Sequence, residues 1–104
     1  MKIRCLILIL IILDSCAANS ELYLSGKHYQ KKHDYQSLKK VLDLMPKYIE
    51  TKQVKRILGR PIDNGFDYRY LSDSISSNQC PVGLVFNINN DGKITHRWLD
   101  EICE

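Results

Sequence analysis

Residues 82–98, VGLVFNINNDGKITHRW, decide the fold because they contain two strands and the turn that joins them. In each half, every second side chain points to the same face, as expected for strands that bury one face. These residues are Val82, Leu84, Phe86 and Ile88 in the first half, and Ile94, His96 and Trp98 in the second. Between the halves, Asn89-Asn90-Asp91-Gly92 is typical of a type I turn closed by a left-handed glycine. The stretch therefore predicts an antiparallel hairpin.

The turn also predicts how the two strands are paired. A three-residue loop with a bulge at Gly92 pairs Asn89 with Lys93, and it sets Ile88 opposite Ile94, Phe86 opposite His96 and Leu84 opposite Trp98. A two-residue Asp91-Gly92 turn would slip the pairing by one residue and send Ile94 and Trp98 to the other face. We prefer the bulged turn because it keeps the apolar residues on one face.

A third strand is predicted before the hairpin. From Gly65 onward, Phe66, Tyr68 and Tyr70 alternate with Asp67, Arg69 and Leu71, a pattern typical of a half-buried strand. Residues 72–79, four of which are serine, predict an exposed loop.

Two short helices are predicted before the strands. Leu38, Val41, Leu42 and Met45 have the spacing of one helix face, with Asp34 as the N-cap and Pro46 as the stop. Val54, Ile57 and Leu58 indicate a second helix, which begins at Glu50 or Thr51 and ends at a left-handed Gly59, followed by Pro61. The predicted fold of residues 35–104 is α+β: two short helices followed by a three-stranded antiparallel meander (ααβββ), with the helices on the apolar face of the sheet.

The first sixteen residues have the pattern of a bacterial lipoprotein signal. Lys2 and Arg4 precede an apolar run over residues 5–13, which at about 1.5 Å per residue is too short to span a bilayer. Leu13-Asp14-Ser15-Cys16 resembles a lipobox with Cys16 as the first mature residue, although Ser15-Cys16-Ala17 also fits an ordinary signal peptidase. We expect residues 1–15 to be removed and acyl chains on Cys16 to anchor the protein. Ala17 favours the outer membrane, facing the periplasm.

Residues 16–34 contain few aliphatic residues and no sustained period, which predicts a lipidated tether. The basic cluster over residues 27–33 is interpreted as a solvated part of this tether, with contact to anionic lipid as the alternative.

Composition limits the class of protein. A chain of 104 residues holds one small domain, and 26% charged residues are typical of a globular protein. Because 15 Lys and Arg nearly balance 12 Asp and Glu, we expect no nucleic-acid partner.

Residues 49–61, IETKQVKRILGRP, resemble the signature of the SmpA/OmlA (BamE-like) family of small outer-membrane lipoproteins, in which a helix ends in Leu-Gly-x-Pro. Tyr68-x-Tyr70 and residues 85–94 resemble the aromatic strand and final hairpin of that family. The resemblance covers residues 42–99, but the Gly and Thr of the family's Gly-Met-Thr step are absent at Tyr48 and Glu50. It implies an accessory role in the assembly of outer-membrane β-barrels.

The four cysteines divide by position. Cys5 leaves with the signal, Cys16 takes lipid, and Cys80 and Cys103 are predicted to form a disulfide in an oxidising compartment. The preferred hairpin register leaves these two residues one position out of line.

We expect no catalytic site, no metal and no cofactor other than the covalent lipid on Cys16. Asn87-x-Asn89-x-Asp91-Gly92 resembles the start of a calcium loop, but Trp98 stands where the bidentate glutamate should be. His96 is the only histidine in the predicted domain, and no nucleophile motif accompanies it.

Two functions from different classes remain. The first is a non-catalytic scaffold of the cell envelope that binds an envelope protein, such as a barrel-assembly component. The second is a periplasmic binding or inhibitor module directed at a hydrolase. Either would use an aromatic surface, for which the candidates are Tyr68, Tyr70 and Trp98.

Overall fold

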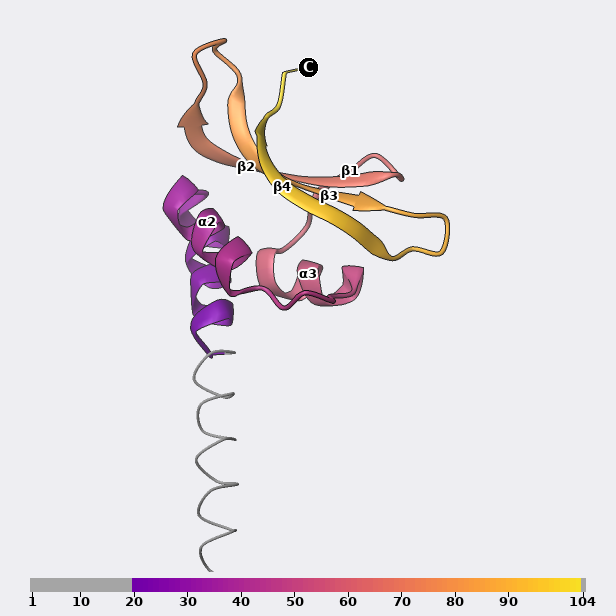
Figure 1. The fold of residues 1–104 in the computed structure, drawn as a ribbon. Helices are drawn as coiled ribbons and strands as arrows, with labels where there is room; N and C mark the ends of the chain where they lie inside the picture. The colour runs from indigo at the N-terminus through magenta and orange to yellow at the C-terminus, as the bar shows by residue number, and fades with distance from the viewer. Residues whose placement is uncertain (1–19, 104) are drawn as a thin grey trace, which may run out of the picture.

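The computed structural model describes residues 20–103 and has two layers, helices followed by an antiparallel sheet. The helices are segment 20–32, α2 (Tyr35–Leu44) and α3 (Thr51–Leu58). The strands are β1 (Ile62–Asp63), β2 (Asp67–Ile75), β3 (Pro81–Ile88) and β4 (Ile94–Glu101), in the order β1-β2-β3-β4. Figure 1 shows the helices on one side of the sheet. The α+β class is confirmed, with one helix and one strand more than predicted.

Residues 20–32 are helical and pack into the core. Leu22 and Tyr29 are 4% and 3% exposed, and both belong to the main hydrophobic cluster. Gly26 lies so close to α3 that a Cβ there would overlap the carbonyl oxygen of Ile57. The prediction of a tether over residues 16–34 is therefore wrong for residues 20–32. The prediction relied on the scarcity of aliphatic residues, but this helix packs largely through small residues and a tyrosine. Residues 16–19 lie outside the described residues.

The caps of α2 and α3 follow from side chains at their first residues. Asp34 is the N-cap of α2 and accepts a hydrogen bond from the Ser37 N–H at 3.1 Å. The N-cap of α3 is Glu50, whose N–H donates to the Gln53 side chain at 3.1 Å, and this settles the open boundary. Gly59 ends α3 at φ 86°, a backbone conformation that favours glycine, as predicted.

Two buried tyrosines join the helices to the sheet. The Tyr70 hydroxyl donates to the carbonyl of Gly59 at 2.8 Å, and the Tyr29 hydroxyl donates to the carbonyl of Leu71 at 2.5 Å. The two rings pack edge to face, with centroids 6.2 Å apart, and Tyr70 packs in the same way on Phe86. Burial raises the pKa of Tyr29 to about 12, so its hydroxyl stays protonated and donates throughout the physiological range.

The hairpin turn forms as predicted, but the strands beyond it shift by one residue. The Asn89 N–H donates to the Lys93 carbonyl, and Ile88 pairs with Ile94. A bulge at Thr95 then sets Phe86 opposite Arg97 and Val85 opposite Trp98. The predicted pairs of Phe86 with His96 and Leu84 with Trp98 are therefore wrong, and His96 and Trp98 lie on the face away from the helices.

Arg97 gives a physical reason for the bulge. With the shift, its side chain faces the helices, where the guanidinium donates to the carbonyls of Pro46 and Met45 at 2.6 and 3.0 Å. These carbonyls follow the end of α2, where helix geometry supplies no partner for them. Glu50 and Lys93 form an isolated antiparallel bridge nearby, so the linker from α2 to α3 lies along the first half of β4.

The outer edge of β2 is closed by two different elements. β1, which is too short to show a sequence period, pairs Ile62 and Asp63 with Arg69 and Tyr68. Farther along, the Asp73 N–H donates to the His33 carbonyl at 2.9 Å, at the junction between segment 20–32 and α2. This contact explains why residues 72–75, which were predicted to be part of a loop, continue the strand. Phe66, which was predicted to be in the strand, precedes it and is 65% exposed.

We expect Gly26→Ala to lower the free energy of unfolding by about 1–3 kcal/mol because the new methyl group overlaps the Ile57 backbone. In an isolated helix the same change would be stabilising. Urea unfolding followed by circular dichroism measures the difference. Lys27→Ala, at an exposed position, is the control and should change stability by less than about 0.5 kcal/mol. A Gly26→Ala protein as stable as wild type would show that this segment does not pack on α3.

Candidate interaction site

The Cys80–Cys103 disulfide is confirmed, with Cα atoms 5.1 Å apart. Val82 pairs with Glu101, and the Ile102 N–H donates to the Pro81 carbonyl at 2.7 Å, so continuing the ladder places Cys80 opposite Cys103. The predicted register left the two cysteines one residue out of line, and the extra residue at Thr95 shifts the strands by the one residue that aligns them. The same bulge therefore turns Trp98 outward and aligns the cysteines.

The structure does not bring the three predicted partner-binding aromatics together. Tyr68 and Tyr70 are 8% and 3% exposed and face the helices, and the Lys55 ammonium lies 5.1 Å from the centroid of the Tyr68 ring. Their assignment to a partner surface is wrong because the apolar face of β2 is covered by the helical layer. Trp98 is 36% exposed on the opposite face, where its indole N–H donates to Asp100.

Trp98 belongs to a row of side chains that crosses the sheet on the face away from the helices. Strand pairing places Ile62 beside Arg69, Arg69 beside Val85 and Val85 beside Trp98. We call these four residues the outer row. The two ends of the row, Ile62 and Trp98, are 40% and 36% exposed, whereas Val85 is buried.

Arg69 is held in the outer row by an ion pair. Its Nε lies 3.2 Å from Oδ2 of Asp67, which is 3% exposed and also accepts from the Asn64 amide at 2.7 Å. The guanidinium is thereby held between the exposed Ile62 and the buried Val85. Trp, Arg and large apolar residues are the types enriched where protein interfaces bury their centres. Sequence reasoning missed the row because Ile62 lies in a two-residue strand and Trp98 was assigned to the inner face.

A cluster of His28, Asp34 and Ser37 has the composition of a hydrolytic triad but not its geometry. The same ring nitrogen, Nδ1 of His28, lies 3.0 Å from Asp34 Oδ1 and 2.6 Å from Ser37 Oγ. In a triad the acid and the nucleophile contact opposite ring nitrogens, so that the base can pass a proton. Here the Ser37 hydroxyl donates directly to Asp34 Oδ2 at 2.8 Å. The cluster is an N-cap of α2 reinforced from segment 20–32.

The cap changes the ionisation of Asp34. Burial opposes ionisation, but hydrogen bonds from the Ser37 hydroxyl and N–H and from His28 outweigh it and hold the pKa of Asp34 below its usual range. The carboxylate is therefore part of the folded state at neutral pH.

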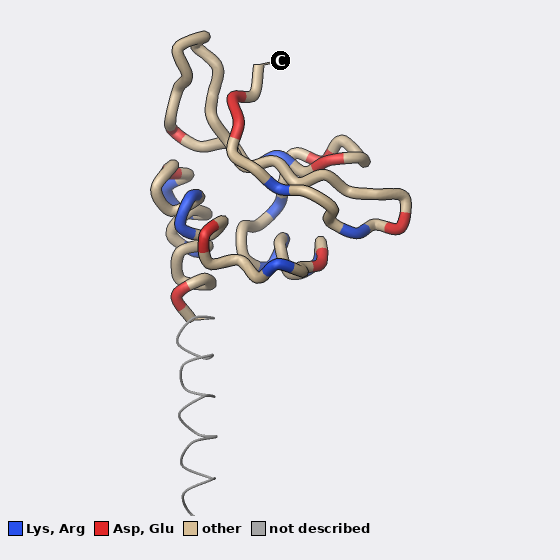
Figure 2. Tube along the Cα trace, in the orientation of Figure 1, with Lys and Arg blue, Asp and Glu red and all other residues tan. Residues whose placement is uncertain are grey.

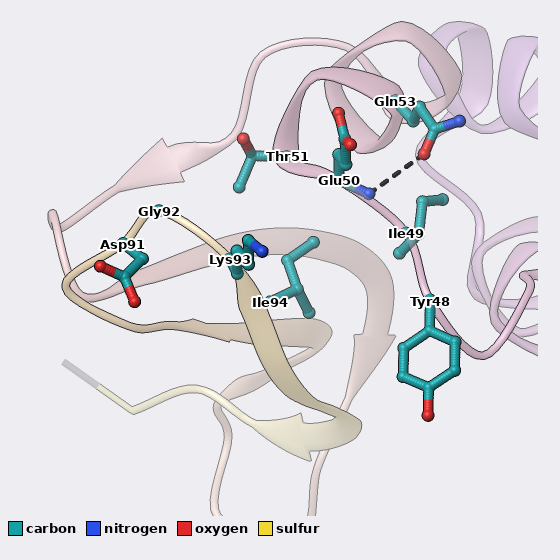
Figure 3. A pocket seen from close by; sticks show the side chains of 9 residues that line it. All are labelled: Tyr48, Ile49, Glu50, Thr51, Gln53, Asp91, Gly92, Lys93 and Ile94. Atoms are coloured by element: carbon teal, nitrogen blue, oxygen red, sulfur yellow. Dashed lines mark hydrogen bonds between the residues drawn. The ribbon is translucent and has the colours of Figure 1, made fainter.

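A surface cleft of about 480 Å³ lies where the start of α3 meets the β3–β4 hairpin, and Figure 3 shows the side chains that line it. It is lined by Tyr48, Ile49, Glu50, Thr51, Gln53, Asp91, Gly92, Lys93 and Ile94. The side-chain carbonyl of Gln53 is already used by the Glu50 N–H, and the lining contains neither histidine nor cysteine. The cleft offers the carboxylates of Glu50 and Asp91 but neither an imidazole nor a thiol, and we interpret it as the seam between two elements.

Cys80, Glu101 and Cys103 lie close enough to hold a metal ion, but the two sulfurs are joined in the disulfide and are not thiolate ligands. Within residues 20–103, no helix combines the length and the apolar character that crossing a membrane requires. The predicted lipidation residue, Cys16, lies outside the described residues.

Comparison with known proteins gives no match to a family model, to a curated protein or to a solved structure. The resemblance to the SmpA/OmlA (BamE-like) family therefore stays a prediction.

Asp34→Ala should lower the free energy of unfolding by about 1 kcal/mol at neutral pH by removing the cap. Because folding lowers the pKa of Asp34, its stabilisation is present above the unfolded value of about 3.9 and is lost as the pH falls through the folded value. Urea unfolding at neutral pH and at about pH 3 should thus show a difference from wild type that shrinks in acid. Asp43→Ala, an exposed carboxylate of α2, is the control. An equal loss in both variants would contradict the assignment.

Cys80→Ala/Cys103→Ala should lower the free energy of unfolding by about 3 kcal/mol, because the bond closes a loop over a sequence separation of 23 residues. Wild-type protein in a reducing buffer should lose a similar amount, whereas the double variant should not respond to the reductant. Unfolding midpoints in urea give both values. Reductant sensitivity of the double variant would show that the loss has another origin.

Proposed function

We propose that this chain is a lipoprotein of the bacterial cell envelope that acts as a non-catalytic protein-interaction module. The lipobox at residues 13–16 supports the anchor on Cys16. The outer row supports the interaction role, and it is the observation that carries the proposal.

The outer row fits a protein partner better than a small ligand. It lies on the face of the sheet away from the helices, and its exposed ends flank an arginine fixed by Asp67. A surface with a tryptophan and a guanidinium held by an ion pair loses little conformational entropy when a partner covers it. The partner is an envelope protein, and the resemblance of residues 49–61 to the BamE-like family favours a component of the barrel-assembly machinery.

The second candidate is an inhibitor of a hydrolase. The turn that follows β2 supports it, since the Ser76 N–H donates to the Cys80 carbonyl and the disulfide ties the end of this turn to Cys103. A braced turn of this kind can enter a cleft with little change of shape. The identity of a captured partner separates the two candidates, because a hydrolase favours the inhibitor and a membrane assembly component favours the scaffold.

The anchor and the surface can be tested in one strain. Metabolic labelling with palmitate should mark the wild-type chain and not Cys16→Ala. A photo-crosslinking residue at position 98 should give a discrete adduct in envelopes, whose partner is identified by mass spectrometry. Without the crosslinker, Trp98→Ala should reduce recovery of that partner roughly 30-fold, the loss typical of an interface hot spot.

Leu24→Ala is the matched control, since Leu24 is 65% exposed but lies on segment 20–32, away from the outer row. It should leave partner recovery unchanged. Equal recovery with Trp98→Ala and with wild type would reject the outer row as the binding surface, and an unlabelled wild-type chain would reject the anchor.

A further inference from the structure

The charges of the protein are divided between its two layers. Residues 20–60, which form the helical layer, contain ten Lys and Arg but four Asp and Glu. Residues 61–103, which form the sheet layer, contain three Lys and Arg but six Asp and Glu. Figure 2 shows most of the basic positions on the helices. A near-neutral chain thus folds into one basic layer and one acidic layer.

The basic residues of the helical layer are available to a partner. All ten are exposed: Lys27, Lys31, Lys32, Lys39, Lys40, Lys47, Lys52, Lys55, Arg56 and Arg60. Within the described part of the chain, Lys40 alone among them forms a salt bridge, with Glu21 at 3.1 Å. Of the other acidic residues in the layer, Asp34 and Glu50 serve as helix N-caps.

The sheet layer contrasts with this arrangement. Arg69 is paired with Asp67, and Arg97 donates to two backbone carbonyls, so Lys93 remains as its exposed cation. The electrostatic potential of the molecule is therefore uneven, and it is positive on the side of the helices.

The start of segment 20–32 limits how far the helical layer can lie from the lipid of Cys16. The start of segment 20–32, indigo in Figure 1, is at the end of this layer farthest from the sheet. Four residue steps separate it from Cys16, and a fully extended chain covers at most about 3.5 Å per step, or about 14 Å in all. That distance is comparable with the Debye length of about 8 Å at physiological ionic strength. An anchored chain must therefore keep the start of the basic layer within about 14 Å of the lipid, which brings its lysines within reach of the headgroups when the layer lies along the membrane.

We propose that the helical layer lies on the anionic phospholipid headgroups of the membrane that holds Cys16, an inference that rests on the proposed lipid anchor. Lysines near an anionic surface each add to the attraction. Two large apolar side chains in the same layer, Leu24 and Tyr48, are 65% and 84% exposed and suit the boundary between headgroups and acyl chains. A soluble acidic protein would not account for the short connection to the anchor. The outer row, on the opposite side, is left facing away from the membrane.

The protein purified from membranes can be tested in nanodiscs of phosphatidylcholine, with and without about one third phosphatidylglycerol. Brief reaction with an amine label, read lysine by lysine by mass spectrometry, reports contact with the surface. Lys27, Lys31 and Lys52 should react about fivefold more slowly in the anionic discs, whereas a lysine introduced by Ser77→Lys, at an exposed position of the turn after β2, should react equally in both. The protection should disappear in about 1 M salt, where the Debye length is about 3 Å. Equal labelling of all four lysines in both kinds of disc would overturn the proposal.

A pair of variants with the same change in net charge separates position from charge. Lys31→Gln/Lys52→Gln should reduce the protection of Lys27 and Lys47 several-fold, and Ser77→Glu/Gln79→Glu, in the exposed turn after β2, should leave it intact. Equal effects of the two variants would overturn the proposal.

The mass of the peptide that contains Cys16, taken from the same sample, tests the anchor separately. If Cys16 carries no lipid, the proposed anchor fails, and flotation of the unanchored chain with vesicles of the same two compositions becomes the readout. Flotation that requires phosphatidylglycerol would support the headgroup contact, and flotation indifferent to it, or absent, would overturn it.

Discussion

The close crossing of segment 20–32 over α3 is the contact on which the rest of the structure depends. Gly26 leaves no room for a side chain against Ile57, and the Gln30 amide donates to the same Ile57 carbonyl at 2.9 Å. This crossing brings Tyr29 under the sheet, where it meets Tyr70 and the carbonyl of Leu71. The helical layer is thereby a single packed unit that begins at the N-terminal end of the described chain.

Much of the fold follows from local rules that residues obey on their own. Three predicted features depend only on residues a few positions apart in the sequence. They are the apolar face with Leu38 and Val41, the N-cap at Asp34 and the turn at Gly92. Segment 20–32 and the bulge at Thr95 depend on partners far away in sequence. A single glycine that contacts another helix leaves no hydrophobic periodicity in the sequence. The hydrogen bonds from Arg97 to two carbonyls after α2 stabilise the bulge, and the sequence of the hairpin alone does not indicate them.

The candidate site divides in the same way. The Cys80–Cys103 bond could be predicted because two cysteines flank one hairpin, and its alignment in the ladder follows from the bulge. The outer row could not be predicted, because it needs the correct register of three strand pairs at once. A shift of one residue is enough to exchange the faces on which Trp98 and Arg97 lie.

The closed edge of β2 also affects how neighbouring copies behave. Unpaired peptide groups along a sheet edge are a template on which a second chain can add a strand, the first step of fibril growth. β1 and the junction at His33 occupy that template on β2, and the α2–α3 linker runs beside the first half of β4. On this side of the sheet, copies crowded together can therefore touch through their side chains without their backbones joining, and the second half of β4 is the stretch of edge left for such pairing.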